Sequence, residues 1–396
     1  MNKKKAAAGL PTAILIRTDT LMNSYEIKDG VMYVRDFRQP PDYFRENGFA
    51  GIRKVVFADD ISVIPRCTMQ LFKELREIVW PKGLKVIGEG CFSDCSSLTD
   101  LNLPEGLETI GESAFQGAEN VKYVHIPCSV REIGRGAFYF GDGGHILAFR
   151  VDPENPAYCD LDGVLYTKDR SALIRYPSAR RRAEYTVPDT VTRICDGAFA
   201  HSHYLHRITL PDGLRVLESS AFSFCTQLEE LDIPETVEGI PSYAFFCCKK
   251  LRRLRLPRRT AYLGYESICN CDSLPELRIP EGISEIDYAA VGGNRRIKEL
   301  VIPEGVKELN NSALIDNAAL ERVVLPSTLE QIWDHAFQGC VRLRELTIPE
   351  SVTYIDDEAF LGCRGLKRIY LKTKHIADGR FLPEELRDHV ELICDL

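Results

Sequence analysis

Two groups of charged residues, opposite in sign and identical in their internal spacing, are the first candidates for binding chemistry. They are Glu229, Glu230 and Asp232, followed by Arg252, Arg253 and Arg255. Guanidinium groups donate hydrogen bonds in a rigid fork, so clustered arginines predict contact with an anion or an acidic partner. Arg278 follows Arg255 by the same interval that separates Arg255 from Asp232 and would place like charges side by side, which is unfavourable without a ligand. The alternative is structural, because opposite charges on neighbouring strands stabilise a sheet mildly.

A second candidate is the aromatic and polar pair Tyr123 and His125. Exposed aromatic side chains are frequent anchors of binding interfaces. An ordinary solvated strand is the alternative interpretation of this pair.

Histidine and cysteine clusters do not predict a metal site. His201, His203 and His206 crowd into HSHYLH, but they straddle a turn into a strand and need not converge. Among the cysteines, Cys247 with Cys248 and Cys269 with Cys271 lack the spacing of a zinc site. We therefore expect no metal and no cofactor.

Catalytic motifs are missing from the sequence. It has no phosphate-binding glycine loop, no HExxH and no nucleophile elbow. Acidic pairs such as Asp356-Asp357 occur where helix-capping acids are expected. We expect a protein that is not an enzyme.

Composition restricts the classes of partner. The chain has 396 residues, 44% hydrophobic and 27% charged, and a net charge of −8. A dedicated nucleic-acid-binding protein would need a basic surface, so nucleic acid is not expected as a partner. No stretch is apolar enough for a membrane span, and Pro11 and Arg17 break the short N-terminal apolar run that follows three lysines. The broken apolar run favours a cytoplasmic protein, and we expect that protein to be a monomer.

A short sequence repeat must position all of these side chains. Its most regular feature is a proline slot that recurs every 23 residues within each of two blocks, which the enlarged unit described below separates. The slot holds Pro81, Pro104 and Pro127, then Pro188, Pro211, Pro234, Pro257, Pro280, Pro303, Pro326 and Pro349, and Ala58 fills it one unit earlier. Apolar residues recur six, three and one residues before the slot and three and six after it, as in LRELTIPESVTYI. This frame predicts a solenoid whose coils each contain a strand, a turn, a short extended piece and a helical turn.

Two further columns run through the repeat. An Ala-Phe pair fills the core, except that Ile268, Val291 and Leu314 replace Phe in three consecutive units, which predicts looser packing or altered curvature there. A small or hydrogen-bonding residue fourteen positions after the slot is most often cysteine. Equivalent side chains point the same way and not at each other, so we expect reduced, buried thiols and a reducing compartment.

The ends and one insertion depart from the repeat. Residues 1–51 are predicted to form an N-terminal cap with a hairpin-like segment, DGVMYVRD, and residues 52–372 the solenoid. An enlarged unit at 150–187 repeats this pattern as DGVLYTKD and predicts a β-hairpin that protrudes from the stack. Residues 373–396 are predicted to be a C-terminal cap with a helix.

The pattern LxxLxLPxxVxxIxxxAFxxC, with the inserted NPxYxxxDGVLYxKDxxxLxxYP segment, resembles the BspA-type leucine-rich repeat family over residues 52–372. The resemblance implies a right-handed curved solenoid with a parallel β-sheet on the concave face. It also implies a non-catalytic interaction or adhesion scaffold, often at the cell surface, that binds a protein or glycan through that sheet or the hairpin. Two alternatives are a solenoid enzyme acting on an acidic polymer and a purely structural module of a larger assembly.

Overall fold

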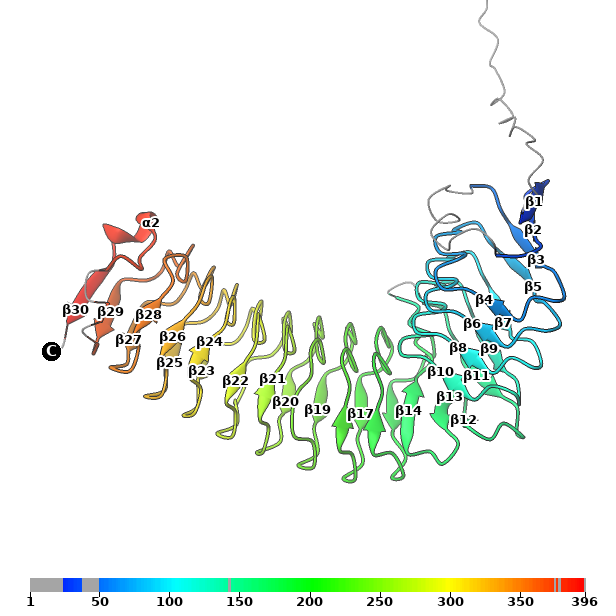
Figure 1. Ribbon diagram of the computed structural model, residues 1–396. Helices are drawn as coiled ribbons and strands as arrows, with labels where there is room; N and C mark the ends of the chain where they lie inside the picture. Colours follow the sequence, from blue (N-terminus) through cyan, green and yellow to red (C-terminus); the bar gives the residue numbers. More distant parts are fainter. Residues whose placement is uncertain (1–23, 38–49, 142–143, 374, 377–378, 395–396) are drawn as a thin grey trace, which may run out of the picture.

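The computed structural model describes residues 24–37, 50–141, 144–373, 375–376 and 379–394. The chain winds into a stack of coils, and the stack bends into an open arc (Figure 1). Neighbouring coils are joined by parallel strand pairs whose partners lie one repeat apart in the sequence, as in the pair of Glu230 with Arg253. The predicted repeat solenoid with parallel strands is confirmed. Helical turns are minimal, and Glu384–Arg387 (α2) is the one α-helix of the described residues.

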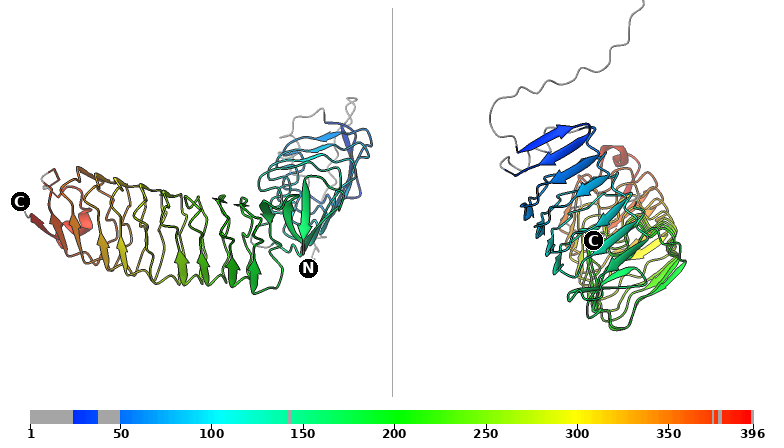
Figure 2. Two further views of the ribbon diagram at one scale, coloured as in Figure 1. Left: turned by 90° about the horizontal axis from the view of Figure 1, so that it is seen from below. Right: turned by 90° about the vertical axis from the view of Figure 1, so that its right-hand side faces the viewer.

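One face of the stack carries strands of three or four residues, which we call the long-strand face (Figure 2). Exposed and buried side chains alternate along these strands because successive residues of a strand point to opposite sides. The long strands are β2 (Val31–Val34), β3 (Lys54–Phe57), β5 (Glu77–Val79), β7 (Asp100–Asn102), β9 (Tyr123–Ile126), β11 (Ala148–Val151), β15 (Glu184–Thr186), β17 (Arg207–Thr209), β19 (Glu230–Asp232), β20 (Arg253–Arg255), β23 (Glu299–Val301), β25 (Arg322–Val324), β27 (Glu345–Ile348), β29 (Arg368–Leu371) and β30 (Glu391–Cys394).

A second ladder consists mostly of two-residue strands. After each short strand the chain makes a run of turns that carries the Ala-Phe pair, and we call the outer surface of these runs the turn face. The strands of the short ladder are β4 (Val63–Ile64), β6 (Val86–Ile87), β8 (Thr109–Ile110), β10 (Glu132–Ile133), β14 (Ala172–Arg175), β16 (Arg193–Ile194), β18 (Val216–Leu217), β21 (Tyr262–Leu263), β22 (Glu285–Ile286), β24 (Glu308–Leu309), β26 (Gln331–Ile332) and β28 (Tyr354–Ile355).

Stacked phenylalanines run along the interior. The rings of Phe199, Phe222 and Phe245 are fully buried and follow one another at centroid distances of 5.4 and 5.5 Å. Offset stacking of this kind adds to the hydrophobic stabilisation. The aromatic column stops after Phe245 and resumes at Phe337, because smaller side chains occupy the column between them.

Buried thiols and amides tie consecutive coils together at the predicted cysteine position. All fourteen cysteines are unpaired. The thiol of Cys248 donates to the carbonyl oxygen of Phe222 at 3.1 Å, and the Asn317 amide donates to the Val291 carbonyl at 2.7 Å. The side chain at this position therefore satisfies a buried backbone acceptor in the preceding coils.

The long ladder is interrupted after β20, and residues 276–278 form no strand. In the preceding coil the backbone N–H of Arg252 donates to the Glu229 carbonyl at 2.7 Å. The equivalent residue in the next coil is Pro275, which has no N–H to donate. The missing ladder bond explains why pairing stops there. This break lies within the stretch where the sequence predicted altered packing.

The enlarged unit lies inside the stack, between two hydrophobic cores. Strands β12 (Tyr158–Leu161) and β13 (Val164–Thr167) form an antiparallel hairpin, and β14 pairs antiparallel with β13 and parallel with β16. The expectation that this hairpin protrudes is wrong, because Val164, Leu165 and Tyr166 are fully buried. Their side chains alternate between two hydrophobic cores, one on each side of the hairpin.

Both ends of the described chain add to the stack. At the N-terminal end β1 (Tyr25–Lys28) and β2 form an antiparallel hairpin, and β2 pairs in parallel with β3. At the C-terminal end β30 follows α2 and pairs in parallel with β29, so strand pairing continues beyond residue 372. The lysine-rich N-terminal segment lies outside the described residues. In the described part of the chain, no helix combines the length and apolar character needed to cross a membrane.

Candidate functional site

The predicted arginine patch lies on the long-strand face, where Arg252, Arg253 and Arg255 are exposed. Arg253 forms ion pairs with Glu230 at 2.9 Å and Asp232 at 2.7 Å. Hydrogen bonds from Arg253 and Arg207 lower the pKa of Glu230. Exposed pairs such as these contribute little to stability. They nevertheless occupy Arg253, which favours the structural interpretation of this residue.

Arg278 is not brought into a continuous basic surface with Arg255. Its coil forms no strand, and Arg255 instead pairs with Glu235 at 3.3 Å. Arg278 lines a depression of about 880 Å³ that it shares with several carboxylates. These are Glu276, Glu281, Glu299 and Glu304. One cation among four carboxylates disfavours an anionic ligand in this depression.

Tyr123 and His125 lie on β9 next to the enlarged unit. Tyr123 is 39% exposed, and the guanidinium carbon of Arg150 lies 5.2 Å from the centre of its ring. His125 is paired in register with Arg150 on β11. The ring of Tyr123 therefore already has a cationic neighbour within the sheet.

The histidines of HSHYLH do not converge. The hydroxyl of Tyr139 lies 3.0 Å from Nε2 of the buried His201, whereas His203 contacts Thr226 and His206 contacts Glu229. Across the residues that the structure describes, one set of three side chains has the proximity of metal ligands: Asp334, His335 and Glu358. Nε2 of His335 lies 3.3 Å from a carboxylate oxygen of Glu358, which belongs to the neighbouring coil.

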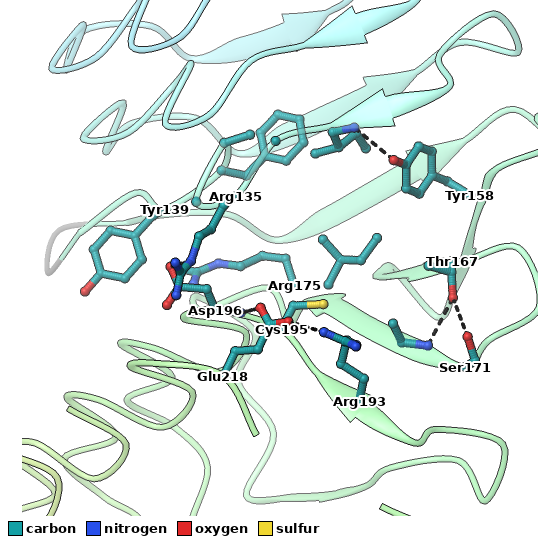
Figure 3. A pocket seen from close by; sticks show the side chains of 17 residues that line it. Arg135, Tyr139, Tyr158, Thr167, Ser171, Arg175, Arg193, Cys195, Asp196 and Glu218 are labelled. Atoms are coloured by element: carbon teal, nitrogen blue, oxygen red, sulfur yellow. Dashed lines mark hydrogen bonds and ion pairs between the residues drawn. The ribbon is translucent and has the colours of Figure 1, made fainter. Parts of the chain in front are cut away.

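A cleft of about 800 Å³ opens beside the enlarged unit, where sequence reasoning placed no site (Figure 3). The short-strand ladder stops at β10 and resumes at β14, so the cleft lies where a strand pair would otherwise close the stack. Ile133, Phe138 and Ile174 form apolar parts of its wall. The Tyr158 hydroxyl accepts the backbone N–H of Ile133 at 2.8 Å and keeps its own proton for another acceptor.

Two ion pairs lie at the cleft. Arg135 is 3.3 Å from Asp196, and Arg193 is 2.7 Å from Glu218. Burial raises the pKa of Asp196. Burial also raises the pKa of the adjacent Cys195 thiol to about 12, so this thiol stays protonated and is a poor nucleophile. The cleft combines an apolar wall with charged side chains, and its described cysteine does not have the environment of an activated thiol.

Arg175, a third cation at the cleft, has a different environment. Its side chain is 3% exposed, and it donates to the backbone carbonyls of Gly197 and Ala200. The ring of Tyr139 covers the guanidinium at 5.3 Å. The Nε–H has no hydrogen-bond partner in the structure. In the sequence, Arg175 stands out as an arginine inside the apolar run SALIRYP. We did not predict it as a site residue, because we considered the exposed strand positions of the repeat.

An aromatic stripe runs along the turn face from the edge of the cleft. Neighbouring ring centres are 4.6 Å apart for His201 and Phe224, 5.3 Å for Phe224 and Phe246, and 4.7 Å for Tyr265 and Tyr288. Tyr243 joins Phe246 to Tyr265. The stripe consists of His201, Phe224, Tyr243, Phe246, Tyr265 and Tyr288.

The stripe was also not predicted from the sequence, because we sought binding residues on the strands. Its signal was present in the repeat register. Tyr265 and Tyr288 occupy the same turn position of the repeat. Two coils before Tyr265 this position holds Ser219, and one coil after Tyr288 it holds Asn311. Aromatic residues at solvent-facing turn positions are not required by the core, so they were candidates for a contact surface.

The comparisons agree on the fold. A family model described as "BspA type Leucine rich repeat region" matches residues 41–142, 181–295 and 292–387 in 6 copies. No curated protein is matched by this sequence.

Among solved structures, a leucine-rich repeat protein from Eubacterium ventriosum has a TM-score of 0.58 at 23% identity, covering 84% of this chain and 90% of that chain. The pneumococcal vaccine antigen PcpA has a TM-score of 0.49 at 19% identity, covering 87% of this chain and 79% of that chain. At 23% identity the likeness to the Eubacterium ventriosum protein concerns the fold alone. The extent of the family match shows that this chain belongs to the BspA-type leucine-rich repeat family.

Proposed function

We propose that this protein is a non-catalytic scaffold that binds a linear glycan along the aromatic stripe. Members of its family are commonly surface or interaction proteins, which agrees with a binding role. The observation that carries the proposal is the continuous run of rings from His201 to Tyr288 on consecutive coils. Tyr288 is 36% exposed, and Phe224, Tyr243 and Tyr265 are half-buried, so their faces or edges remain accessible.

Aromatic faces suit sugars because the ring face is negative and the axial C–H bonds of a pyranose carry slight positive charge. Burial, with the nearby Glu266 carboxylate adding to it, raises the pKa of Tyr265 to about 12. Its hydroxyl therefore remains a hydrogen-bond donor far into the alkaline range. The stripe thus offers both stacking surfaces and a polar group for sugar hydroxyls.

The shape of the stripe favours a linear polymer over a folded protein. Stable protein interfaces bury about 800 Å² on each partner and need a broad patch, whereas the stripe is a single line of rings. Single-stranded nucleic acids also stack on aromatic ladders, but they require a basic groove. The net charge of −8 disfavours that ligand.

The predicted patch on the long-strand face stays a second candidate surface, for a protein or an acidic glycan. Arg252 and Arg278 are the exposed arginines of the predicted patch that form no ion pair with another described residue. A catalytic role on an acidic polymer would need positive charge around Arg278. The four glutamates of that depression make such a substrate a poor fit.

The experiment is affinity electrophoresis of the full chain through gels containing neutral polysaccharides such as xylan, glucan and galactan. The double variant Tyr265→Ala/Tyr288→Ala should weaken retention at least about tenfold, equal to about 1.4 kcal/mol. Tyr262→Ala is the matched control, because Tyr262 is 41% exposed on the same coil as Tyr265 but lies outside the stripe.

Arg255→Glu/Arg278→Glu is the control for the other surface and should leave polysaccharide retention unchanged. Loss of retention in that variant, with retention kept in the tyrosine variant, would move the binding site to the long-strand face. Failure of the unaltered chain to bind any polysaccharide would contradict the proposal and favour a structural module or a protein ligand.

A further inference from the structure

The charges at the cleft do not balance. Arg135 pairs with Asp196 and Arg193 pairs with Glu218, which leaves Arg175 as the surplus charge among the lining residues. Within the described residues, no carboxylate lies within ion-pair distance of Arg175. Two of its nitrogens donate to neutral carbonyls, and its Nε–H is unpartnered although the side chain is almost fully buried. A buried cation in this state is stabilised by an incoming anion.

We infer that the cleft binds one carboxylate group, carried by a uronic-acid residue of the glycan that lies on the aromatic stripe. This inference rests on the proposed function. A group with one negative charge would pair with Arg175 and accept a hydrogen bond from its free Nε–H. The positive and negative charges at the cleft would then be equal in number.

Tyr139 connects the cleft to the stripe. Its ring lies on the Arg175 guanidinium at 5.3 Å, and its hydroxyl lies 3.0 Å from Nε2 of His201, the first ring of the stripe. In Figure 3, Arg135 and Asp196 meet beside Arg175 on the side of the cleft where Tyr139 lies. A chain of sugars on the stripe would therefore reach the cleft without leaving the turn face.

The wall of the cleft suits a sugar acid better than an inorganic anion. Ile133 and Ile174 offer apolar surface to a pyranose ring, and Tyr158 has a hydroxyl proton free to donate. A sulfate or phosphate ion would leave this apolar surface without a partner. We expect selectivity for an organic carboxylate.

The test is isothermal titration of the full chain with a galacturonic-acid trisaccharide and with its fully methyl-esterified form. The two probes have the same rings and differ in charge. The unaltered chain should bind the acid at least tenfold more tightly than the ester, and Arg175→Gln should abolish this preference while keeping affinity for the ester. Equal affinity of the unaltered chain for both probes would overturn the inference.

Two further variants cover the possibility that Arg175→Gln does not fold. Ile174→Trp fills the cleft without changing its charge, and it should also remove the preference for the acid. Arg322→Gln makes the same charge change on the long-strand face and should retain the preference. A folded Ile174→Trp variant that still prefers the acid would overturn the inference.

Competition separates the carboxylate from other anions and from the stripe. If inorganic sulfate displaced the acid trisaccharide as effectively as free galacturonate does, the assignment of the site to a carboxylate would be overturned. The Phe224→Ala variant, which removes the ring of the stripe next to His201, should weaken both trisaccharides equally. If the unaltered chain binds the ester and the acid equally, the carboxylate site is contradicted but the glycan-binding function is not. If the unaltered chain binds no neutral polysaccharide, the glycan-binding function itself is contradicted.

Discussion

At the residue scale, each position of the repeat unit has one physical task that most coils fulfil with the same side chain. The cysteine position illustrates this. Cys225, Cys248 and Cys363 donate their thiols to the carbonyl of a column phenylalanine in a preceding coil. Asn294 and Asn317 do the same with a side-chain amide, to the aliphatic residue that takes the place of phenylalanine there. The position thus requires a small donor rather than sulfur chemistry.

Thiol reactivity should follow burial. Burial raises the pKa of Cys225 and Cys363 from 9.0 to about 12, and the thiolate is the reactive form. A disulfide reagent should label the exposed Cys394 in the native chain but label Cys225 and Cys363 only after unfolding. Mass-spectrometric mapping of labelled peptides checks this, and native labelling of Cys225 as fast as Cys394 would contradict it.

The same shifts set a pH dependence of stability. Because the pKa of the buried thiols is higher in the folded than in the unfolded chain, their contribution is fully present below pH 9.0 and is lost as the pH rises towards about 12. Urea unfolding in this range should therefore show a falling free energy of unfolding. Cys225→Ala should reduce that slope.

At the element scale, the same short hairpin occurs at the start of each core. Asp29-Gly30 and Asp162-Gly163 both have positive φ values, 52° and 78° in the first and 53° and 75° in the second. Such values suit a tight turn between antiparallel strands. Met32 and Val34 after the first turn begin the N-terminal core, and Val164 and Tyr166 after the second begin the C-terminal core. The enlarged unit therefore acts as an internal cap.

Gly163→Ala should disrupt this internal cap. The positive φ is unfavourable for alanine by about 1–2 kcal/mol, and the added Cβ would lie 2.8 Å from Cβ of Ala148. Denaturant unfolding should show a loss of at least that size. Gly213→Ala is the control, because its added Cβ would meet only the Asp189 carbonyl oxygen, at 3.9 Å. Equal stability of the two variants would contradict the tight-turn argument.

At the scale of the whole molecule, the stack contains two hydrophobic cores that meet at β13. One extends from Met32 to Leu165 and the other from Val164 to Val390. Coils of a solenoid contact only their neighbours, so each core can unfold as a separate unit. The cleft and the start of the aromatic stripe both lie at this junction.

Calorimetry should therefore resolve two unfolding transitions. Phe337 is fully buried and stacks on Phe360 at 5.3 Å, so Phe337→Ala should cost about 3–5 kcal/mol. The variant should lower only the transition of the C-terminal core. Val341→Ala, which alters a side chain that is 42% exposed, should change neither. A single transition that moves as a whole in Phe337→Ala would contradict the division into two cores.

The sequence by itself determined the repeat, the parallel stacking and the buried cysteine and phenylalanine columns, because these depend on positions that recur once in every coil. It also located the ion pairs of Arg253, since one coil is one repeat long. Only the tertiary structure decided the outcome of the enlarged unit, because whether Leu165 meets solvent or a second core depends on contacts on both sides of the hairpin. The cleft and the unpartnered Nε–H of Arg175 arise in the same way, from residues that no single repeat brings together.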